Sequence, residues 1–175
     1  MDKATLRTTF LKRRKLLDEK MHQLFSMMLK DKLKTYLKEH NVKTLGIYYP
    51  MRKEIDLLDF KDEFDTHLPK VGKKGIVYYQ DRGAYEPAPF HTTVPTHNDI
   101  TALDSLDAVI VPGLVFDKDR YRIGYGKGYY DELLSRYKGL SIGVCFELFM
   151  LDSIPKEPHD KQCDVLITES RIIKE

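Results

Sequence analysis

The sequence has little cysteine and no long apolar run, and each scarcity narrows the class of protein. Only two of its 175 residues are cysteines, Cys145 and Cys163, with neither C-x-x-C spacing nor a nearby metal-ligand partner. We therefore expect reduced, partly buried thiols. No segment reaches the ~18 apolar residues that a membrane-spanning helix needs, and the charged amino-terminal stretch has no signal-peptide core. These features predict a cytoplasmic protein without a membrane partner.

A strong excess of one charge is also missing. The chain has 29 basic and 27 acidic residues, a net charge of +2. A general nucleic-acid binder usually carries a large basic excess, so no nucleic-acid partner is expected. The basic residues are concentrated in residues 1–40, which include the run Lys12-Arg13-Arg14-Lys15. We interpret this run as the solvated face of a helix rather than as an RNA-binding patch.

The common phosphate-binding signatures are absent as well, and no catalytic signature stands in its usual structural setting. The six histidines form no metal-ligand pair by spacing, and the one G-x-S-x-G, at residues 139–143, falls in a stretch predicted to be a strand and not at the turn from strand to helix that exposes a nucleophilic serine. This speaks against acyl-enzyme hydrolysis and zinc chemistry. Neither G-x-G-x-x-G nor G-x-x-x-x-G-K-[ST] occurs.

One glycine-rich stretch stands out among the residues that are present. The segment from Arg122 to Asp131 reads R-I-G-Y-G-K-G-Y-Y-D. It follows an apolar run at 106–111, predicted to be a buried strand, and precedes a predicted helix at 129–137. A glycine loop before a helix start offers unpaired N–H groups and a favourable dipole to phosphate. The pattern alone leaves open a plain turn that joins two elements.

Several charged and aromatic residues are candidates for chemistry, each with a structural alternative. Arg122 and Lys127 can neutralise phosphate oxygens, or be solvated loop charges. Asp131 can bind Mg²⁺, or complement the dipole of the helix that it begins. Asp164 can be a second metal ligand or a turn residue. Glu54 can bind the N–H groups of a polar ring, or be a helix-start charge. A flat heterocycle can stack on tyrosines that otherwise serve ordinary packing: Tyr48, Tyr49, Tyr125, Tyr129 and Tyr130.

The order of predicted elements indicates an α/β fold. Two helices, at 3–17 and 21–36, precede the first predicted strand at 44–49. A helical pattern at 56–66 follows, and further strands are predicted at 68–71, 75–79, 106–111, 140–146, 164–168 and 172–173. This strand–helix–strand order predicts a three-layer open, mainly parallel sheet flanked by helices, in a single domain spanning residues 1–175. Ligands in such folds bind beyond the carboxyl ends of the strands, here near Pro112 and Phe146.

The segment at 80–98 interrupts this order. Pro87, Pro89 and Pro95 exclude a regular helix and confine any strand to an edge. Tyr85, Phe90 and His91 stand between these prolines. The segment is either a flap over a site or a long connection, and loops of this length are more often functional than not.

Taken together, these motifs resemble the 5-formyltetrahydrofolate cyclo-ligase family over essentially the whole chain. The central match is the run from Val111 to Asp117 followed by the glycine stretch 122–131. Shorter pieces match in order: Lys3-Ala4-Thr5-Leu6-Arg7, Glu54-Ile55, Tyr85-Glu86-Pro87, Ile154-Pro155 through His159-Asp160, and Asp164 to Glu169. The approach to the loop departs from the family pattern and makes Arg120 a rival phosphate contact.

The resemblance implies an ATP- and Mg²⁺-dependent ligase that closes 5-formyltetrahydrofolate to 5,10-methenyltetrahydrofolate and releases ADP and phosphate. Arg122 and Lys127 would be catalytic, and Asp131 and Asp164 would hold Mg²⁺. The implied ATP-binding residues are Lys3, Arg7, Arg122, Ile123, Gly124, Tyr125, Gly126, Lys127, Gly128, Tyr129 and Tyr130. The implied folate-binding residues are Tyr49, Glu54, Tyr125, Gly126, Lys127, Gly128 and Tyr129. We expect a monomer or weak dimer.

Two other classes of function are weighed against this enzyme. A nucleotide-binding regulatory module of the same fold would lack a metal carboxylate, yet Asp131 and Asp164 are both present. An RNA-associated protein using the helical region at 7–34 would show steeply salt-dependent binding and a net charge well above +2.

Overall fold

The computed structural model describes residues 1–89 and 92–175. Its α-helices are α1 (Lys3–Leu16), α2 (Glu19–Glu39) and α3 (Tyr129–Arg136). Short 3-10 helices form at η1 (Leu58–Asp62), η3 (Leu103–Ser105) and η4 (Glu147–Phe149). The strands are β1 (Thr44–Gly46), β2 (Asp65–Gly72), β3 (Gly75–Gln80), β4 (Tyr85–Ala88), β5 (Thr92–Pro95), β6 (Ile100–Thr101), β7 (Ala108–Val111), β8 (Val115–Asp117), β9 (Arg122–Ile123), β10 (Leu140–Val144), β11 (Met150–Leu151), β12 (Val165–Ile167) and β13 (Ile172–Ile173).

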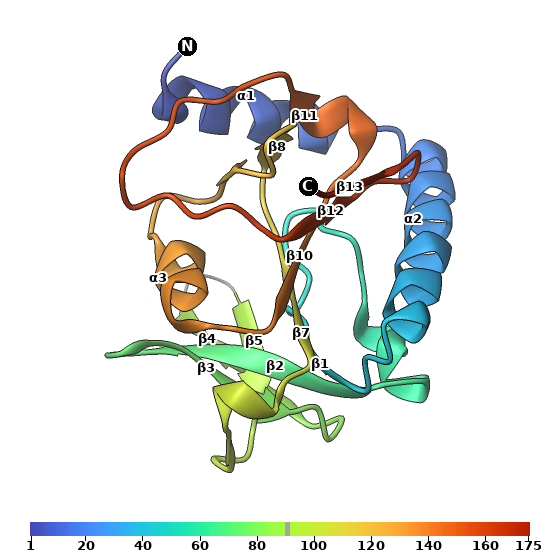
Figure 1. Cartoon of the computed structure of the whole chain (residues 1–175), viewed down its shortest axis with the longest axis vertical. Coiled ribbons are helices and arrows are strands. Elements are labelled where there is room, and N and C mark those ends of the chain that lie inside the picture. The colour runs from blue at the N-terminus through green and yellow to red at the C-terminus, as the bar shows by residue number, and fades with distance from the viewer. Residues whose placement is uncertain (90–91) are drawn as a thin grey trace.

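A mixed central sheet organises the chain (Figure 1). Its strand order is β13-β12-β10-β7-β1-β2-β3-β6. The five strands from β12 to β2 pair in parallel, whereas β13, β3 and β6 are antiparallel additions at the two edges. The expectation of a mainly parallel α/β sheet is therefore confirmed.

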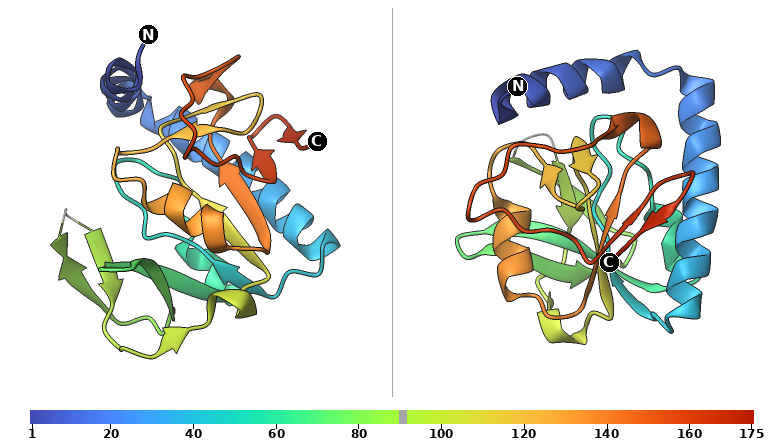
Figure 2. Two further views of the ribbon diagram at one scale, coloured as in Figure 1. Left: turned by 60° about the vertical axis from the view of Figure 1, so that its left-hand side comes forward. Right: turned by 45° about the horizontal axis from the view of Figure 1, so that its top comes forward.

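Helices cover both faces of this sheet, which gives the three layers that the sequence predicts (Figure 2). Alternate residues of β7 point to opposite faces, because the side-chain period of a strand is two. Ala108 and Ile110 belong to the hydrophobic cluster beneath α1 and α2. Val109 and Val111 belong to the cluster beneath α3. A strand that is buried on both faces is apolar at every position, and this is why β7 could be predicted from the sequence.

Side-chain caps and an apolar stripe define the two amino-terminal helices. The Asp2 carboxylate accepts a hydrogen bond from the Thr5 amide, and the Asp18 carboxylate accepts one from the Met21 amide. Caps of this kind satisfy amides that a helix start leaves unpaired. Leu29, Leu33 and Leu37 of the stripe are fully buried. Both predicted helices are confirmed, and α2 is longer at each end than its stripe indicates.

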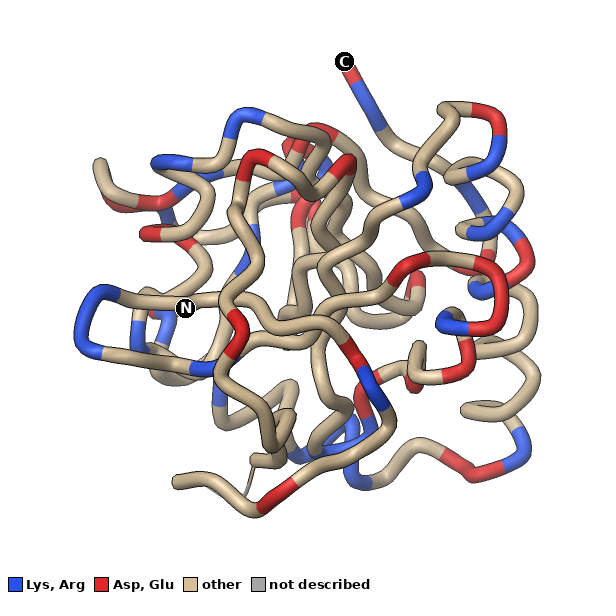
Figure 3. The backbone as a smooth tube through the Cα atoms, turned by 90° about the horizontal axis from the view of Figure 1, so that it is seen from below, with Lys and Arg blue, Asp and Glu red and all other residues tan. Residues whose placement is uncertain are grey.

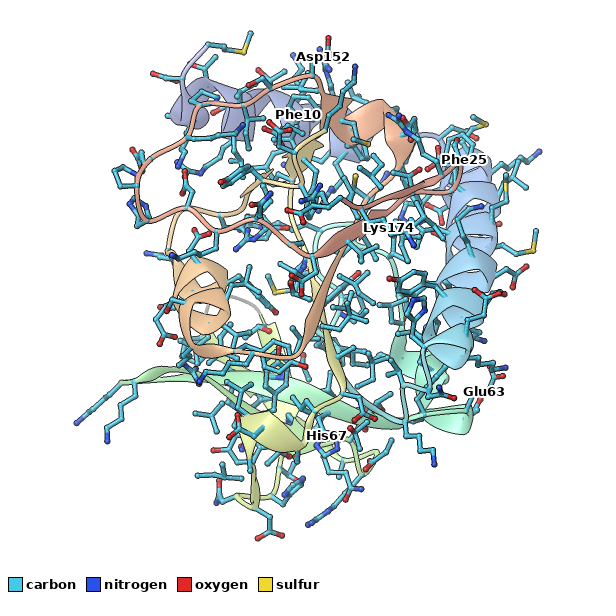
Figure 4. The ribbon with its side chains drawn as sticks, viewed as in Figure 1. Phe10, Phe25, Glu63, His67, Asp152 and Lys174 are labelled. Atoms are coloured by element: carbon cyan, nitrogen blue, oxygen red, sulfur yellow. The ribbon has the colours of Figure 1, made fainter. Side chains whose placement is uncertain are left out.

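Aromatic side chains tie these helices to the segment after β10. Phe10 of α1 packs edge-on against Phe149, with ring centroids 6.2 Å apart, and Phe25 of α2 packs against Phe146 at 5.6 Å. Figure 4 labels Phe10 and Phe25 on their helices. These contacts hold α1 across the carboxyl ends of the parallel strands. Figure 2 shows α1 along one edge of the molecule.

The helix predicted at 56–66 is wrong. The segment forms only the 3-10 turn η1, and β2 begins at Asp65. The Asp56 carboxylate accepts a hydrogen bond from the Leu58 amide, which favours a turn over a helix. Residues 65–67 then pair in parallel with β1, so their backbone N–H and C=O groups form hydrogen bonds between strands that a short helix would not allow.

The Pro-rich segment forms a hairpin rather than an irregular connection. β4 and β5 pair antiparallel as a separate two-stranded sheet, with Tyr85 opposite Pro95 and Pro87 opposite Thr93. Prolines fit here because each strand has a free edge. Phe90 and His91 lie outside the described residues.

The placement of charged residues, the character of the helices and the state of the cysteines can be compared with the expectations from composition. Basic and acidic residues are interspersed along the chain in Figure 3. No helix within 1–89 and 92–175 combines the length and the apolar character that crossing a membrane requires. Cys145 and Cys163 are free thiols, and both are fully buried rather than partly so.

Candidate active site

The sheet has a topological switch point between β1 and β7. The chain leaves β1 toward β2 on one side, and it leaves β7 toward β10 and β12 on the other. Crevices at such points, beyond the carboxyl ends of the strands, are the usual ligand sites of open α/β sheets. Glu54, Gly113 and the glycine stretch all follow these ends, so the switch point gathers the residues that the sequence singles out.

A small pocket of about 20 Å³ lies at this point. The pocket is lined by the segments at the ends of β1, β7 and β10, which are neighbouring strands, and by one residue of α1. The lining residues are Arg14, Tyr48, Lys53, Glu54, Ile55, Pro112, Gly113, Val144, Cys145, Phe146 and Phe149.

The glycine stretch runs from β9 into α3. β8 and β9 form a short antiparallel pair, an element that the sequence analysis missed because each strand has only two or three residues. Gly126 has φ +95°, and Gly128, the residue before α3, has φ +71°. Both lie in the left-handed region, where a side chain is strained. The predicted glycine loop at a helix start is therefore present.

The two predicted phosphate-binding arginines, Arg7 and Arg122, come to this loop from different elements. Arg7 of α1 donates from Nε to the Gly124 carbonyl at 3.1 Å. Arg122 is buried, with its guanidinium 5.2 Å from the centre of the Tyr130 ring. Among the described residues, its Nε is buried without a hydrogen-bond partner. An unpaired buried donor of this kind is costly, and a ligand anion would satisfy it.

Lys3 and Arg120 are engaged away from the loop. Lys3 forms ion pairs with Asp160 at 2.5 Å and Glu157 at 3.2 Å. Arg120 is buried, and its Nε donates to the Cys163 carbonyl at 3.0 Å. Arg120 therefore has a structural partner of its own, which weakens it as a rival phosphate contact.

Glu54 brings a carboxyl group to the pocket. Its Oε1 accepts a hydrogen bond from the Met51 amide at 2.9 Å. Its Oε2 is buried and, within the described part of the chain, has no partner. Burial raises the pKa of Glu54 to about 7, against the opposing influence of Arg14, Arg122 and Arg52. The pocket thus presents an unsatisfied acceptor whose charge changes near neutral pH.

Two tyrosines of the predicted folate site lie beside lining residues of this pocket: Tyr49 follows Tyr48 in the chain, and the Tyr125 hydroxyl contacts Arg14. Tyr49 packs edge-on against Tyr85 of β4, with ring centroids 5.7 Å apart. The guanidinium of Arg52 lies 4.8 Å from the centre of the Tyr125 ring. Burial, together with the Glu54 charge, raises the pKa of Tyr125 to about 12, so its phenol stays protonated. Tyr129 instead packs against the cluster beneath α3.

The two proposed metal carboxylates have different partners. Asp131, in the first turn of α3, accepts a hydrogen bond from the Lys161 amide at 3.1 Å. Asp164 precedes β12 and accepts from the amide and the hydroxyl of Ser141, at 2.9 and 3.2 Å. Asp164 and Ser141 lie at the amino-terminal ends of the parallel strands β12 and β10, whereas Asp131 lies at the start of α3, and no hydrogen bond or ion pair of the described residues joins the two carboxylates.

One cluster of potential metal ligands in the described residues includes a histidine. Glu157, His159 and Asp160 each bring one ligand atom within 4.8 Å of the others. His159 and Glu157 are exposed, and Lys3 already pairs with both carboxylates. The cluster serves as the anchor for the start of α1.

Arg14 is the site residue that the sequence analysis missed. The basic run at 12–15 is interpreted there as solvated, but Arg14 is buried. Its Nη2 donates to the Gly113 carbonyl at 2.7 Å, and its Nη1 lies 3.4 Å from the Tyr125 hydroxyl. Its position on the same face as Leu6 and Phe10 is the signal that could have found it.

Comparison with known proteins agrees with this geometry. The family model described as "5-formyltetrahydrofolate cyclo-ligase family" matches residues 1–169. The 5-formyltetrahydrofolate cyclo-ligase of Mycoplasma pneumoniae is 29% identical, covering 97% of this chain and 99% of the relative. That of Mycoplasma genitalium is 30% identical, covering 95% and 98%.

A solved structure supports the same grouping. The NMR structure of Aquifex aeolicus 5,10-methenyltetrahydrofolate synthetase is 31% identical, with a TM-score of 0.88 over 99% of this chain and 93% of that chain. The fold and the family match both cover nearly the whole sequence. The chain belongs to the 5-formyltetrahydrofolate cyclo-ligase family.

Proposed function

We propose that this chain is a ligase that closes 5-formyltetrahydrofolate to 5,10-methenyltetrahydrofolate at the expense of ATP. The observation that carries the proposal is that the glycine loop, through Tyr125, contacts Arg14 in the wall of the Glu54 pocket at the switch point of the sheet. One side offers N–H groups and arginines to phosphate, and the other offers a carboxyl group and tyrosines to a polar ring.

The reaction needs activation of a poor leaving group. The formyl oxygen attacks the γ-phosphorus of ATP, and ADP departs. The second nitrogen of the substrate then attacks the activated carbon and gives up its proton to solvent, the C–O bond breaks, and the oxygen leaves with the phosphate. Phosphoryl transfer asks a protein mainly for positioning and for stabilisation of charge. A site without a covalent nucleophile is adequate for this chemistry.

The loop is the proposed phosphate site. Arg122 and Lys127 neutralise phosphate oxygens, and Arg7 holds the loop against α1 through Gly124. The amides of residues 123–130 and the start of α3 supply further donors. Lys3, at the start of the same helix, reaches ATP by exchanging its present partners Glu157 and Asp160.

The folate is proposed to enter from the side of Tyr49 and Glu54. The buried Oε2 of Glu54 accepts from ring N–H groups, which satisfies the acceptor that is otherwise unpaired. Tyr49 and Tyr125 contact the flat ring, and residues 126–129 lie between this ring and the phosphates. The formyl group and the γ-phosphate then meet at the loop.

Magnesium is the proposed metal, with Asp131 and Asp164 as its protein ligands. Carboxylate oxygens are the donors that Mg²⁺ prefers, so the residues fit the ion chemically. When bound, the ion would neutralise charge on the ATP phosphates. Asp131 begins α3 beside the loop, whereas Asp164 must share or exchange its bonds to Ser141.

We also propose that the protein acts in the cytoplasm as a monomer or weak dimer, without nucleic-acid partners. The balanced charge, net +2, supports the absence of nucleic acid. The alternative of a regulatory module that binds nucleotide without turnover predicts ATP binding but no product.

An absorbance assay at the methenyl product's band tests the proposal. Purified protein is mixed with 5-formyltetrahydrofolate, ATP and Mg²⁺, with controls that omit ATP or add a chelator. A rise that requires both, and that collapses in Arg122→Ala, is expected. A flat trace from folded protein that still binds ATP would favour the regulatory module.

A further inference from the structure

Arg14 is unlike its neighbours in the basic run of α1. Lys12, Arg13 and Lys15 are exposed, whereas Arg14 is buried. A buried guanidinium loses its hydration and must be compensated by hydrogen bonds or charge. Among the described residues, Arg14 has no carboxylate within ion-pair distance. Its compensation must therefore come from the site that it faces.

The contacts of Arg14 join three parts of that site. Its guanidinium donates to the carbonyl of Gly113, which follows β7, and reaches the Tyr125 hydroxyl in the glycine loop. It lies 5.8 Å from the centre of the Phe149 ring, which belongs to η4 after β10. A planar fork with several donors can hold such partners at fixed angles, whereas a lysine ammonium cannot.

Glu54 shares the pocket with Arg14 and has the unsatisfied acceptor. Arg14 is the largest influence that favours the charged form of Glu54. The other titratable or charged groups near Glu54 come from its own segment, β9, the glycine loop, α3 and the end of β10. They are Tyr48, Arg52, Lys53, Arg122, Tyr125, Tyr130 and Cys145.

We propose that Arg14 is a positioning residue of this site, which fixes the Gly113 carbonyl and Tyr125 across the pocket and keeps Glu54 as the anion that receives the substrate ring. The inference rests on the proposed function for its substrate. Arg14 acts through Glu54 and Tyr125, which contact the ring, so its loss should affect the folate more than ATP.

Steady-state kinetics over a range of pH test this role. Three variants are compared. Arg14→Gln removes both the charge and the planar guanidinium, whereas Arg14→Lys keeps the charge. Lys12→Gln is an exposed control on the same helix. In Arg14→Gln we expect the KM for 5-formyltetrahydrofolate to rise about tenfold, equivalent to ~1.4 kcal/mol, with the KM for ATP unchanged. The low-pH limb of kcat/KM should move to higher pH.

The conservative variant separates charge from geometry. Arg14→Lys should keep the low-pH limb near that of the unaltered protein, because the charge remains, yet still raise the KM for the folate. In a Glu54→Gln background, adding Arg14→Gln should move no pH limb. A purely structural role predicts instead that Arg14→Gln loses kcat through unfolding, with the pH limb and both KM values unchanged, and this result would overturn the proposal.

A titration of the free protein gives a readout that needs no turnover. Carboxyl ¹³C shifts of labelled glutamate follow Glu54, assigned by its absence from Glu54→Gln. The Glu54 midpoint should rise in Arg14→Gln and stay unchanged in Lys12→Gln and in Arg14→Lys. If Arg14→Gln does not fold, Arg14→Met, which also removes the charge, takes its place. An unchanged midpoint in Arg14→Gln, or a raised one in Arg14→Lys, would refute the link. Absence of cyclisation by the unaltered protein would instead refute the proposed function.

Discussion

Arg7 donates a hydrogen bond from its Nε to the carbonyl of Gly124, 3.1 Å away and 117 positions later in the chain. The same guanidinium carbon lies 3.3 Å from where a Cβ on Gly126 would stand. The first helix and the glycine loop therefore fit together closely, and this fit depends on the absence of a side chain at Gly126.

Gly126→Ala should impair nucleotide use. Gly126 has φ +95°, so an alanine there is strained by ~1–2 kcal/mol and would also press on Arg7. We expect the loop to shift and the KM for ATP to rise at least about tenfold, a change of ~1.4 kcal/mol in binding. Steady-state kinetics with varied ATP measure this effect.

Gly83→Ala is the matched control for that variant. Gly83 also has a positive φ, +77°, but nothing lies within 4 Å of its Cβ position. Thermal unfolding should show a similar loss of stability for the two variants, with activity lost only in Gly126→Ala. Equal activity in both would contradict a role of the loop in ATP binding.

Gly143→Ala should destabilise the fold without touching the loop. A Cβ at this position in β10 would lie 2.5 Å from the Phe116 ring, which is fully buried. Overpacking of this kind costs ~1–3 kcal/mol. Urea unfolding should show that loss, whereas Gly72→Ala, where the nearest atom is 3.9 Å away, should be near neutral. Equal midpoints would show that Phe116 moves aside freely.

The sequence predicts most of the fold because the buried parallel strands and the amphipathic helices follow simple periodicities. β7 and α2 are examples, since one is apolar on both faces and the other has a leucine stripe. The segment at 56–66 misleads because a helical pattern there competes with pairing to β1, a contact between distant parts of the chain.

The glycine loop could also be predicted, because the residues that define it are consecutive in the sequence. Arg14 could not be, because its burial depends on packing against Gly113 and Tyr125, about a hundred residues away. The separate hydrogen bonds of Asp131 and Asp164 are likewise tertiary facts. The resemblance names both as metal ligands, and that assignment stays a prediction.

Asp131→Asn and Asp164→Asn should each weaken the use of Mg²⁺. Removing one carboxylate charge should raise the Mg²⁺ concentration needed for half-maximal activity about tenfold, as expected for loss of ~1.4 kcal/mol. Activity is measured against Mg²⁺ at saturating ATP. Asp164→Asn should also lower the melting temperature, because the bonds to Ser141 lose their charged acceptor. An unchanged Mg²⁺ requirement in Asp164→Asn would leave that residue a purely structural role.

Glu54→Gln should make the protein more stable at alkaline pH. Burial raises the pKa of Glu54 from 4.5 to about 7. Between these values the folded chain holds a proton that the unfolded chain has released, so the free energy of unfolding falls as the pH rises from 4.5 to about 7. Glutamine stays neutral and can still accept from the Met51 amide, so it avoids a cost on the order of 3 kcal/mol above pH ~7.

Glu63→Gln is the control with the opposite sign. Hydrogen bonds from Lys38 and Lys34 lower the pKa of Glu63 to about 2, so its stabilising contribution is present above pH 4.5 and is lost as the pH falls toward 2. Melting temperatures at pH 4.5 and pH 8 compare the two variants. We expect Glu54→Gln to gain stability over the unaltered protein only at pH 8, and Glu63→Gln to lose stability there. A Glu54→Gln variant that is less stable at pH 8 would mean that the charged carboxylate is well solvated in the pocket, and the basis for its coupling to Arg14 would fail with it.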